Sequence, residues 1–181
     1  MEVIKTAIDG LVIVEPRVFK DARGYFFESF SQREFEEKVR PINFVQDNES
    51  KSKYGVLRGL HFQKGKDAQS KLVRVVKGRV LDVAVDIRKG SPTFGKYVAV
   101  ELTEDNHRQF FVPRGFAHGF VVLSEDAQFQ YKVDNVYAPQ AEVTLKFDDE
   151  ELGIDWKVPK EDLLLSEKDK KGVLLKDVKS L

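Results

Sequence analysis

Gly55-Val-Leu-Arg-Gly-Leu-His-Phe-Gln63 combines an arginine and a histidine with the apolar residues of a buried β-strand. Side chains alternate between the two faces of a strand, so Arg58 and His61 point in opposite directions if this strand is regular. They share a pocket only where the strand is irregular, and Gly59 between them is the residue type that permits a bulge or a close backbone approach. A lone histidine in an apolar strand is more often a hydrogen-bonded core residue than a catalyst, so a chemical role needs support from other segments.

The composition indicates one globular unit without a bulk electrostatic preference. The 181 residues show no compositional break, so we expect a single domain over residues 1–181. Lys plus Arg and Asp plus Glu are 30 each, which gives no net charge to attract nucleic acid. Cysteine is absent, the N-terminus lacks the apolar run of a signal peptide, and no apolar run is long enough to cross a bilayer. We therefore expect a cytoplasmic protein with no membrane or nucleic-acid partner.

Short segments rich in Val, Ile, Phe and Tyr recur along the chain between Gly, Pro, Asn and Asp, which is typical of an all-β sandwich or barrel. One short helix is expected, because Ser31-Gln-Arg-Glu34 fits a capping box and the helix must end before Pro41. The segments predicted to be extended are Leu11–Val14, Tyr25–Phe30, Tyr97–Leu102, Gln109–Val112 and Ala127–Val133, together with a β-hairpin over Lys71–Arg88 that turns at Lys77-Gly78.

Two of these segments place polar residues on defined faces. In the second arm of the hairpin, Asp82 and Asp86 alternate with apolar residues, and their face either lines a lumen or meets solvent. In Ala127–Val133 the alternation is strict and directs Tyr131 inward. A hydrogen-bonded core tyrosine is the more frequent reason for such a residue.

Few side chains in or beside the apolar strands are able to transfer protons. They are His61, Lys71, His118 and Tyr131, and they suggest acid–base chemistry. No Gly-x-Ser-x-Gly elbow and no cysteine offers a hydrolase nucleophile. A metal site is not expected. A jelly-roll barrel often holds a metal with two closely spaced histidines, a carboxylate and a later histidine, but here Gln63 stands two residues after His61. His107 falls in a predicted turn, so His61 and His118 form an incomplete ligand set.

Lys71 begins a strand in which Val73 and Val75 are apolar. An inward lysine there is costly unless an anionic group binds it, whereas an exposed lysine at the strand end costs nothing. Arg23, Arg58 and Lys168 are able to contact phosphates, although most such residues are surface residues. The residues alone leave these alternatives open.

Eight ordered motifs carry a resemblance that runs almost from end to end. They are Arg23-Gly-x-Phe26-x-Glu28, Gln46-Asp-Asn48, Leu57-Arg-Gly-Leu-His61-x-Gln63, Gln69-x-Lys71, Gly90-Ser-Pro-Thr-Phe-Gly95, Pro113-x-Gly-Phe-Ala-His-Gly-Phe120, Tyr131-Lys132 and Ser166-x-Lys-Asp169. Together they resemble the dTDP-4-dehydrorhamnose 3,5-epimerase family. The resemblance implies a cupin-type jelly-roll β-barrel or sandwich with short peripheral helices, free of metal and cofactor, that forms a homodimer. It also implies epimerisation at C3 and C5 of dTDP-4-dehydro-6-deoxy-D-glucose, which gives dTDP-4-dehydro-L-rhamnose for rhamnose synthesis.

By this resemblance His61 is the base that removes protons next to the ketone, and Asp169 pairs with it. Lys71 stabilises the enolate oxygen, and Tyr131 is the acid on the opposite face of the sugar. Tyr137 stacks on thymine. The other residues expected to bind the nucleotide sugar are Arg23, Glu28, Gln46, Asp47, Asn48, Arg58, Lys71, His118, Glu142 and Lys168, some of them donated by the partner chain.

The chain departs from the family after Glu142, where Thr144-Leu145 and Phe147-Asp148-Asp149 replace the Gly-Ile and Trp-Asn-Asp of its relatives. Two other functions stay open at this point. One is a single-site 3- or 5-epimerase or a ketoisomerase acting on a related dTDP-4-keto-sugar. The other is a non-catalytic sugar-nucleotide-binding cupin, which would be expected to lack the base or the acid.

Overall fold

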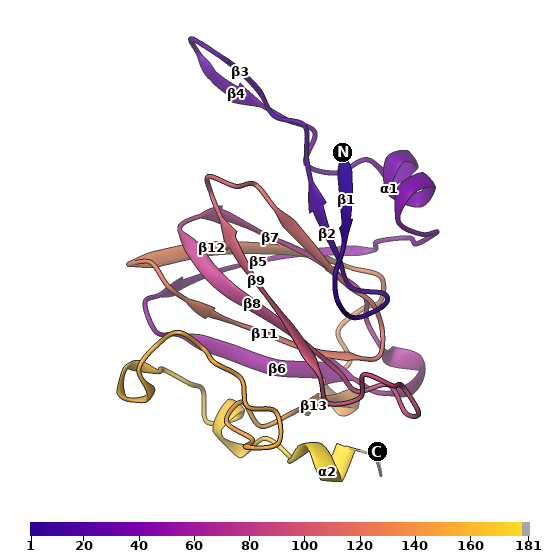
Figure 1. The fold of residues 1–181 in the computed structure, drawn as a ribbon, viewed down its shortest axis with the longest axis vertical. Coiled ribbons are helices and arrows are strands. Elements are labelled where there is room, and N and C mark those ends of the chain that lie inside the picture. The colour runs from indigo at the N-terminus through magenta and orange to yellow at the C-terminus, as the bar shows by residue number, and fades with distance from the viewer. Residues whose placement is uncertain (179–181) are drawn as a thin grey trace.

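The computed structural model describes residues 1–178 and contains two antiparallel sheets that face each other (Figure 1). The six-stranded sheet has the order β1 (Glu2–Lys5), β2 (Val12–Glu15), β10 (Gln109–Val112), β7 (Lys71–Lys77), β12 (Asp126–Val133) and β5 (Gln46–Lys53). The five-stranded sheet has the order β13 (Glu142–Thr144), β6 (Leu57–Gln63), β11 (Phe116–Val122), β8 (Arg79–Asp86) and β9 (Tyr97–Thr103). The all-β jelly-roll class expected from the sequence is confirmed.

The principal core fills the space between the sheets. Inward residues of the six-stranded sheet, such as Val73 and Phe129, meet Ala84 and Phe120 of the other sheet. Stacking of Phe120 on Phe129, with ring centroids 4.1 Å apart, joins the two layers directly. This packing fixes the distance between the sheets, and hence the width of any pocket between them.

The prediction that the two strands within Lys71–Arg88 pair with each other as a hairpin is wrong. The chain turns at Gly78 as expected, but β7 pairs with β10 and β12, whereas β8 pairs with β11 and β9 in the other sheet. Gly78 has a φ of +80°, and a β-carbon there would lie 2.1 Å from the carbonyl oxygen of Asp126. Only glycine therefore fits this turn, through which the chain passes from one sheet to the other. Alternation in sequence identifies strands but not their partners.

The outer face of each sheet is covered by a different part of the chain. Helix α1 (Gln32–Lys38) places Phe35 against Phe111 on the six-stranded sheet, and Ser31 caps it by accepting a hydrogen bond from the Glu34 amide as predicted. The C-terminal part, which includes α2 (Leu175–Val178), covers the five-stranded sheet with an apolar cluster that contains Trp156 (Figure 1). The described part of the chain also contains four 3₁₀ turns, at Gly65–Asp67, Pro139–Ala141, Lys160–Asp162 and Asp169–Lys171.

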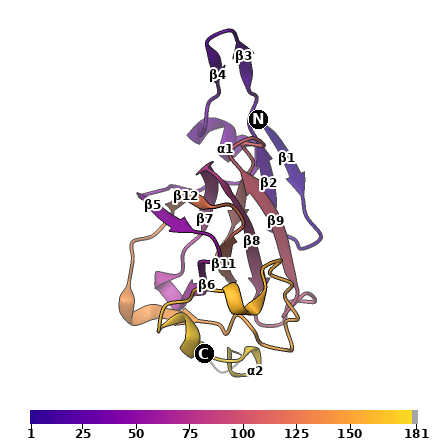
Figure 2. The same ribbon diagram turned by 90° about the vertical axis from the view of Figure 1, so that its left-hand side faces the viewer.

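A small hairpin stands apart from both sheets. Strands β3 (Phe19–Asp21) and β4 (Gly24–Phe26) pair only with each other and project away from the body in both ribbon views (Figures 1 and 2). The strand predicted over Tyr25–Phe30 therefore ends at Phe26. Three aromatic side chains of this arm are more than half exposed: Phe19, Tyr25 and Phe26.

The chain segment before Asp169 runs beside β6. The Leu57 amide donates to the Leu164 carbonyl at 3.0 Å and the Leu164 amide donates to the Gly55 carbonyl at 2.9 Å, which forms a parallel bridge. This bridge places Leu164 beside the start of β6, and the chain then continues to Asp169, which contacts His61 further along the strand. Among residues 1–178, no helix has the length and apolar character needed to cross a membrane.

Candidate active site

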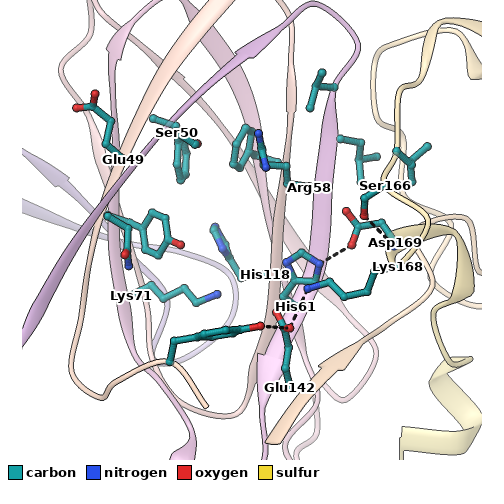
Figure 3. A pocket seen from close by; sticks show the side chains of 18 of the residues that line it. Glu49, Ser50, Arg58, His61, Lys71, His118, Glu142, Ser166, Lys168 and Asp169 are labelled. Carbon is teal, nitrogen blue, oxygen red and sulfur yellow. Dashed lines mark hydrogen bonds and ion pairs between the residues drawn. The ribbon is translucent and has the colours of Figure 1, made fainter. Parts of the chain in front are cut away.

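A cavity of about 910 Å³ opens between the sheets on the side where β5 faces β6. Its walls come from β5, β6, β7, β11, β12 and β13, and the segment 164–169 closes one side. The volume is that of a site for a nucleotide-sized molecule. Figure 3 shows that the labelled polar side chains reach into it from both sheets.

A bulge in β6 directs both Arg58 and His61 into this cavity, as the glycine between them suggested. His118 pairs with His61, but Phe120 pairs with Arg58, so β6 has one more residue than β11 over this interval. Gly59 has a φ of +130°, and a β-carbon there would lie 2.6 Å from the Gly119 α-carbon. Only glycine fits at this position. The extra residue in β6 reverses the side of the strand on which Arg58 lies, so that Arg58 and His61 point to the same side.

His61 is held by a carboxylate from a distant part of the sequence. Its Nε2 donates to Asp169 Oδ1 at 2.5 Å, and the Asp169 amide is in turn 3.1 Å from Ser166 Oγ (Figure 3). Burial is the largest single effect and raises the pKa of Asp169. The interaction with His61 and the hydrogen bonds from Ser166 and the Gly59 main chain together outweigh it and hold that pKa below its usual value. With the proton on Nε2, the lone pair of Nδ1 is free to accept a proton.

Lys71 projects into the cavity from the opposite sheet (Figure 3). Burial lowers its pKa to about 8, while the negative charges of Asp82 and Glu142 act in the other direction and Lys168 adds to the lowering. Of the two positions that the sequence left open for Lys71, inward and exposed at the strand end, the inward one is therefore correct. An ammonium group in such a site favours a ligand that carries or develops negative charge.

Asp82 and His118 form a second carboxylate–imidazole pair in the wall. His118 Nε2 donates to Asp82 Oδ1 at 2.8 Å, and both residues are buried. The other oxygen, Asp82 Oδ2, is buried without a hydrogen-bond partner among residues 1–178. The lumen interpretation of the Asp82 face is thus correct, and this carboxylate contributes a negative field close to Lys71.

Tyr131 lines the same cavity from β12, so the inward direction predicted by alternation is confirmed. Its ring centroid lies 6.0 Å from Lys71 Nζ. Burial raises the pKa of Tyr131 above its ordinary value, which keeps the phenol protonated at neutral pH. Tyr131 and His61 stand on facing sheets, so a ring bound between them meets a proton donor and a proton acceptor from different sides.

Three charged or phenolic groups meet at the mouth of the cavity. Glu142 Oε2 accepts hydrogen bonds from Tyr137 at 2.9 Å and from Lys168 at 2.8 Å (Figure 3 shows the lysine and the glutamate). Burial is the largest single effect and raises the pKa of Glu142, but these two hydrogen bonds and the nearby charges of Lys168 and His61 together lower it overall. Glu142 lies in this cluster even though the sequence around it departs from the family pattern.

Most residues expected in the site line this cavity. They are His61, Tyr131, Lys71, Asp169, Gln46, Asn48, Arg58, His118, Tyr137, Glu142 and Lys168.

Three others lie elsewhere in the chain. Asp47 points to the opposite face of β5 and pairs with Lys132 at 2.9 Å, as strand alternation between Gln46 and Asn48 requires. Arg23 is 90% exposed at the tip of the β3–β4 arm and binds only Asp21 there, and Glu28 lies at the base of the arm beside another hollow.

Sequence reasoning placed Asp82 on a face that either lines a lumen or meets solvent but gave it no role in the site, and the structure pairs it with His118. A carboxylate inside a continuously apolar strand is the signal that identifies it. Phe120 and Phe129 also line the cavity: Phe120 ends one of the quoted motifs, and Phe129 lies on the same alternating face as Tyr131. Ser50 lines the cavity too and has no distinguishing pattern in the sequence. Within residues 1–178, no group of three His, Asp or Glu side chains has a geometry able to hold a metal ion.

Comparison with known proteins identifies the family of the chain. A model described as dTDP-4-dehydrorhamnose 3,5-epimerase matches residues 5–177. The chain is 59% identical to a protein of that name from Salmonella typhimurium over 157 residues, which is 86% of each chain. A crystal structure of a dTDP-4-dehydrorhamnose 3,5-epimerase from Elizabethkingia anophelis is 56% identical, with a TM-score of 0.93 over 98% of this chain and 97% of the other. A Legionella pneumophila dTDP-6-deoxy-D-glucose-3,5-epimerase in complex with dTDP-4-keto-L-rhamnose is 49% identical, with a TM-score of 0.93 over 97% and 93%.

Proposed function

The chain belongs to the dTDP-4-dehydrorhamnose 3,5-epimerase family, and we propose that its cavity converts dTDP-4-dehydro-6-deoxy-D-glucose into dTDP-4-dehydro-L-rhamnose. The observation that carries this proposal is the arrangement of His61 with Asp169, Lys71 and Tyr131 around one cavity. The ketone at C4 makes the hydrogens on C3 and C5 acidic, so the reaction needs a base, a group that stabilises the enolate and an acid on the other side.

His61 is the base. Its Nδ1 takes the proton from C3 or C5, and the positive charge that forms on the ring is stabilised by Asp169 at 2.5 Å. The bond to Asp169 also fixes the tautomer that leaves Nδ1 unprotonated. Lys71, charged at neutral pH with a pKa of about 8, stabilises the negative charge on the enolate oxygen.

Tyr131 returns a proton to the opposite face of the sugar, which inverts the carbon. We expect the Tyr131→Phe variant to exchange the C5 proton with solvent but to fail at normal inversion, because removal of the proton needs only His61 and Lys71. NMR of substrate and product in D₂O measures both events. Normal product formation by this variant contradicts the role of Tyr131.

The nucleotide occupies the mouth of the cavity. Arg58 and Lys168 line it and supply donors to the diphosphate, while Tyr137 offers an exposed ring on which thymine stacks. Gln46, Asn48, His118 and Glu142 provide the remaining polar contacts. Asp47 is left out, because its carboxylate is on the other face of the sheet.

Arg23 and Glu28 do not line the active-site cavity of their own chain. The β3–β4 arm projects from the body and exposes Phe26 to 71% and Tyr25 to 59%, which is apolar surface that a partner would cover. We propose a homodimer in which the arm of each chain docks on the other and brings Arg23 to the partner's cavity. An arginine donor beside the diphosphate then completes the binding site.

Mixing two inactive variants tests this arrangement. A chain with Arg23→Ala and a chain with His61→Ala form a mixed dimer in which one cavity has both residues intact. Random re-pairing should restore about a quarter of the wild-type rate, since half of the dimers are mixed and one of their two cavities is complete. No recovery on mixing, with mixed dimers verified by mass, would place Arg23 in its own chain's cavity.

We further propose that the enzyme acts in the cytoplasm, because a chain without cysteine is suited to a reducing compartment and lacks any disulfide. Fractionation of cells that express the tagged protein tests this location, and recovery in the periplasmic or membrane fraction contradicts it.

A further inference from the structure

Gln63, the last residue of β6, is buried and uses its whole side-chain amide. Its Nε2 donates to the carbonyl of Asp67 at 2.6 Å and to the carbonyl of Val136 at 3.2 Å. Its Oε1 accepts from the amide of Ala138 at 2.9 Å. Gln63 does not line the cavity, although His61, two residues earlier, does. The side chain therefore acts on the neighbouring chain segment and not on a ligand.

Two of these three hydrogen bonds lie on either side of Tyr137. Gln63 binds the carbonyl before this residue and the amide after it, in a stretch where residues 134–138 form neither helix nor strand. The same segment is held upstream, where the Ser70 amide donates to Asp134 Oδ1 at 2.6 Å and Gln69 Nε2 donates to the Asn135 carbonyl at 2.7 Å. Around Tyr137 itself, Gln63 supplies the main-chain partners that a neighbouring strand would otherwise provide.

Tyr137 needs such an anchor because little else holds it. The residue is 54% exposed at the cavity mouth, and its hydroxyl has one hydrogen bond, to Glu142. An exposed ring on an irregular segment samples many positions unless its main chain is fixed, and ordering it on binding costs affinity. Fixing it in advance removes that cost.

We propose that Gln63 is a positioning residue for nucleotide binding, which fixes the main chain on both sides of Tyr137 so that the ring is held at the cavity mouth before the ligand arrives. The proposal rests on the contact between Tyr137 and the base in the proposed function. The chemistry of the amide explains the residue type, since one group must donate to two carbonyls and accept from one amide. A carboxylate has no donor, and methionine has neither donor nor strong acceptor.

Two variants test the role without changing the catalytic groups. Gln63→Met removes all three hydrogen bonds at similar volume, and Gln63→Glu keeps the length and the acceptor but loses both donors. We expect each to raise the Kd for dTDP and the KM for the nucleotide sugar about tenfold, with kcat at saturation within about twofold of wild type. Calorimetric titration with dTDP and steady-state kinetics measure these values, and thermal melting verifies that each variant is folded.

Arg114→Ala is the matched control. Arg114 Nε binds Asp134 Oδ2 at 3.0 Å on the exposed side of the same segment, so its loss perturbs that segment without touching the main chain around Tyr137. We expect dTDP binding to be unchanged in this variant. An unchanged Kd for dTDP in folded Gln63→Met, or a fall in kcat with no rise in KM, overturns the proposal.

A double variant identifies the route of the effect. In a Tyr137→Ala background, Gln63→Met should weaken dTDP binding no further, because the ring that it positions is gone. Equal losses in both backgrounds would show that Gln63 does not act through Tyr137, and the base contact would stand. If Tyr137→Ala alone leaves dTDP binding unchanged, the base contact itself fails, and the role of Gln63 fails with it.

Discussion

The charge on Lys71 should set the alkaline limit of activity. With a pKa of about 8, roughly nine tenths of the Lys71 side chains are charged at pH 7 and about one tenth at pH 9. Since only the ammonium form stabilises the enolate, kcat/KM should fall about tenfold per pH unit once the pH exceeds this pKa. The dependence of kcat/KM on pH reports ionisations of the free enzyme, so the structure without ligand is the correct reference.

The assay is the initial rate of epimerisation at low substrate concentration between pH 6 and about 9.5. Tyr131 is not expected to produce the same limb, because burial raises its pKa above the ordinary 10. Lys71→Arg distinguishes the lysine directly, since a guanidinium stays charged throughout this range. Its activity should be lower but should have no alkaline limb near pH 8.

Two results would refute this reasoning. One is a wild-type profile that stays flat through pH 9.5, which would mean that the charge on Lys71 is not needed. The other is an alkaline limb that persists unchanged in Lys71→Arg, which would assign the limb to another group.

Three further variants or treatments probe the same site. Asp82→Asn keeps an acceptor for His118 but removes a negative charge that raises the pKa of Lys71, so its alkaline limb should move to lower pH, and an unmoved limb contradicts the coupling. His61→Ala should keep dTDP binding nearly intact while turnover falls by at least ~10², as measured by titration and by NMR of the product; retained turnover removes His61 from its role. Treatment with a chelator should leave full activity, and metal analysis that finds stoichiometric zinc or iron, with activity lost on its removal, would contradict the expectation that the site holds no metal.

Local patterns in the sequence predicted what depends on neighbouring residues. The cap at Ser31, the inward direction of Tyr131 and the irregularity at Gly59 each follow from residues within one turn or one strand, and each is present in the structure. The fold class followed from the many short strands. These features depend on side-chain periodicity and backbone freedom, which the sequence displays directly.

Features that depend on residues far apart in the sequence could not be predicted from such local patterns. Alternation in β7 and β8 identified two strands but placed them in one hairpin, because two apolar faces do not indicate which strand lies next to which. Asp169 meets His61 across 108 residues, and only the resemblance to a family connected them. For Arg23 the sequence motif was recognised, but nothing in the local sequence indicates that the residue lies on a projecting arm.

Solvent exchange at the two carbons beside the ketone tests the central claim most directly. The purified wild-type protein is incubated in D₂O with dTDP-4-dehydro-6-deoxy-D-glucose, and the product is analysed by NMR. We predict one deuterium at C3 and one at C5, both with inverted configuration, because one base and one acid face the same ring. Deuterium at a single carbon would identify a single-site epimerase or ketoisomerase, and its absence from both would contradict proton abstraction in this cavity.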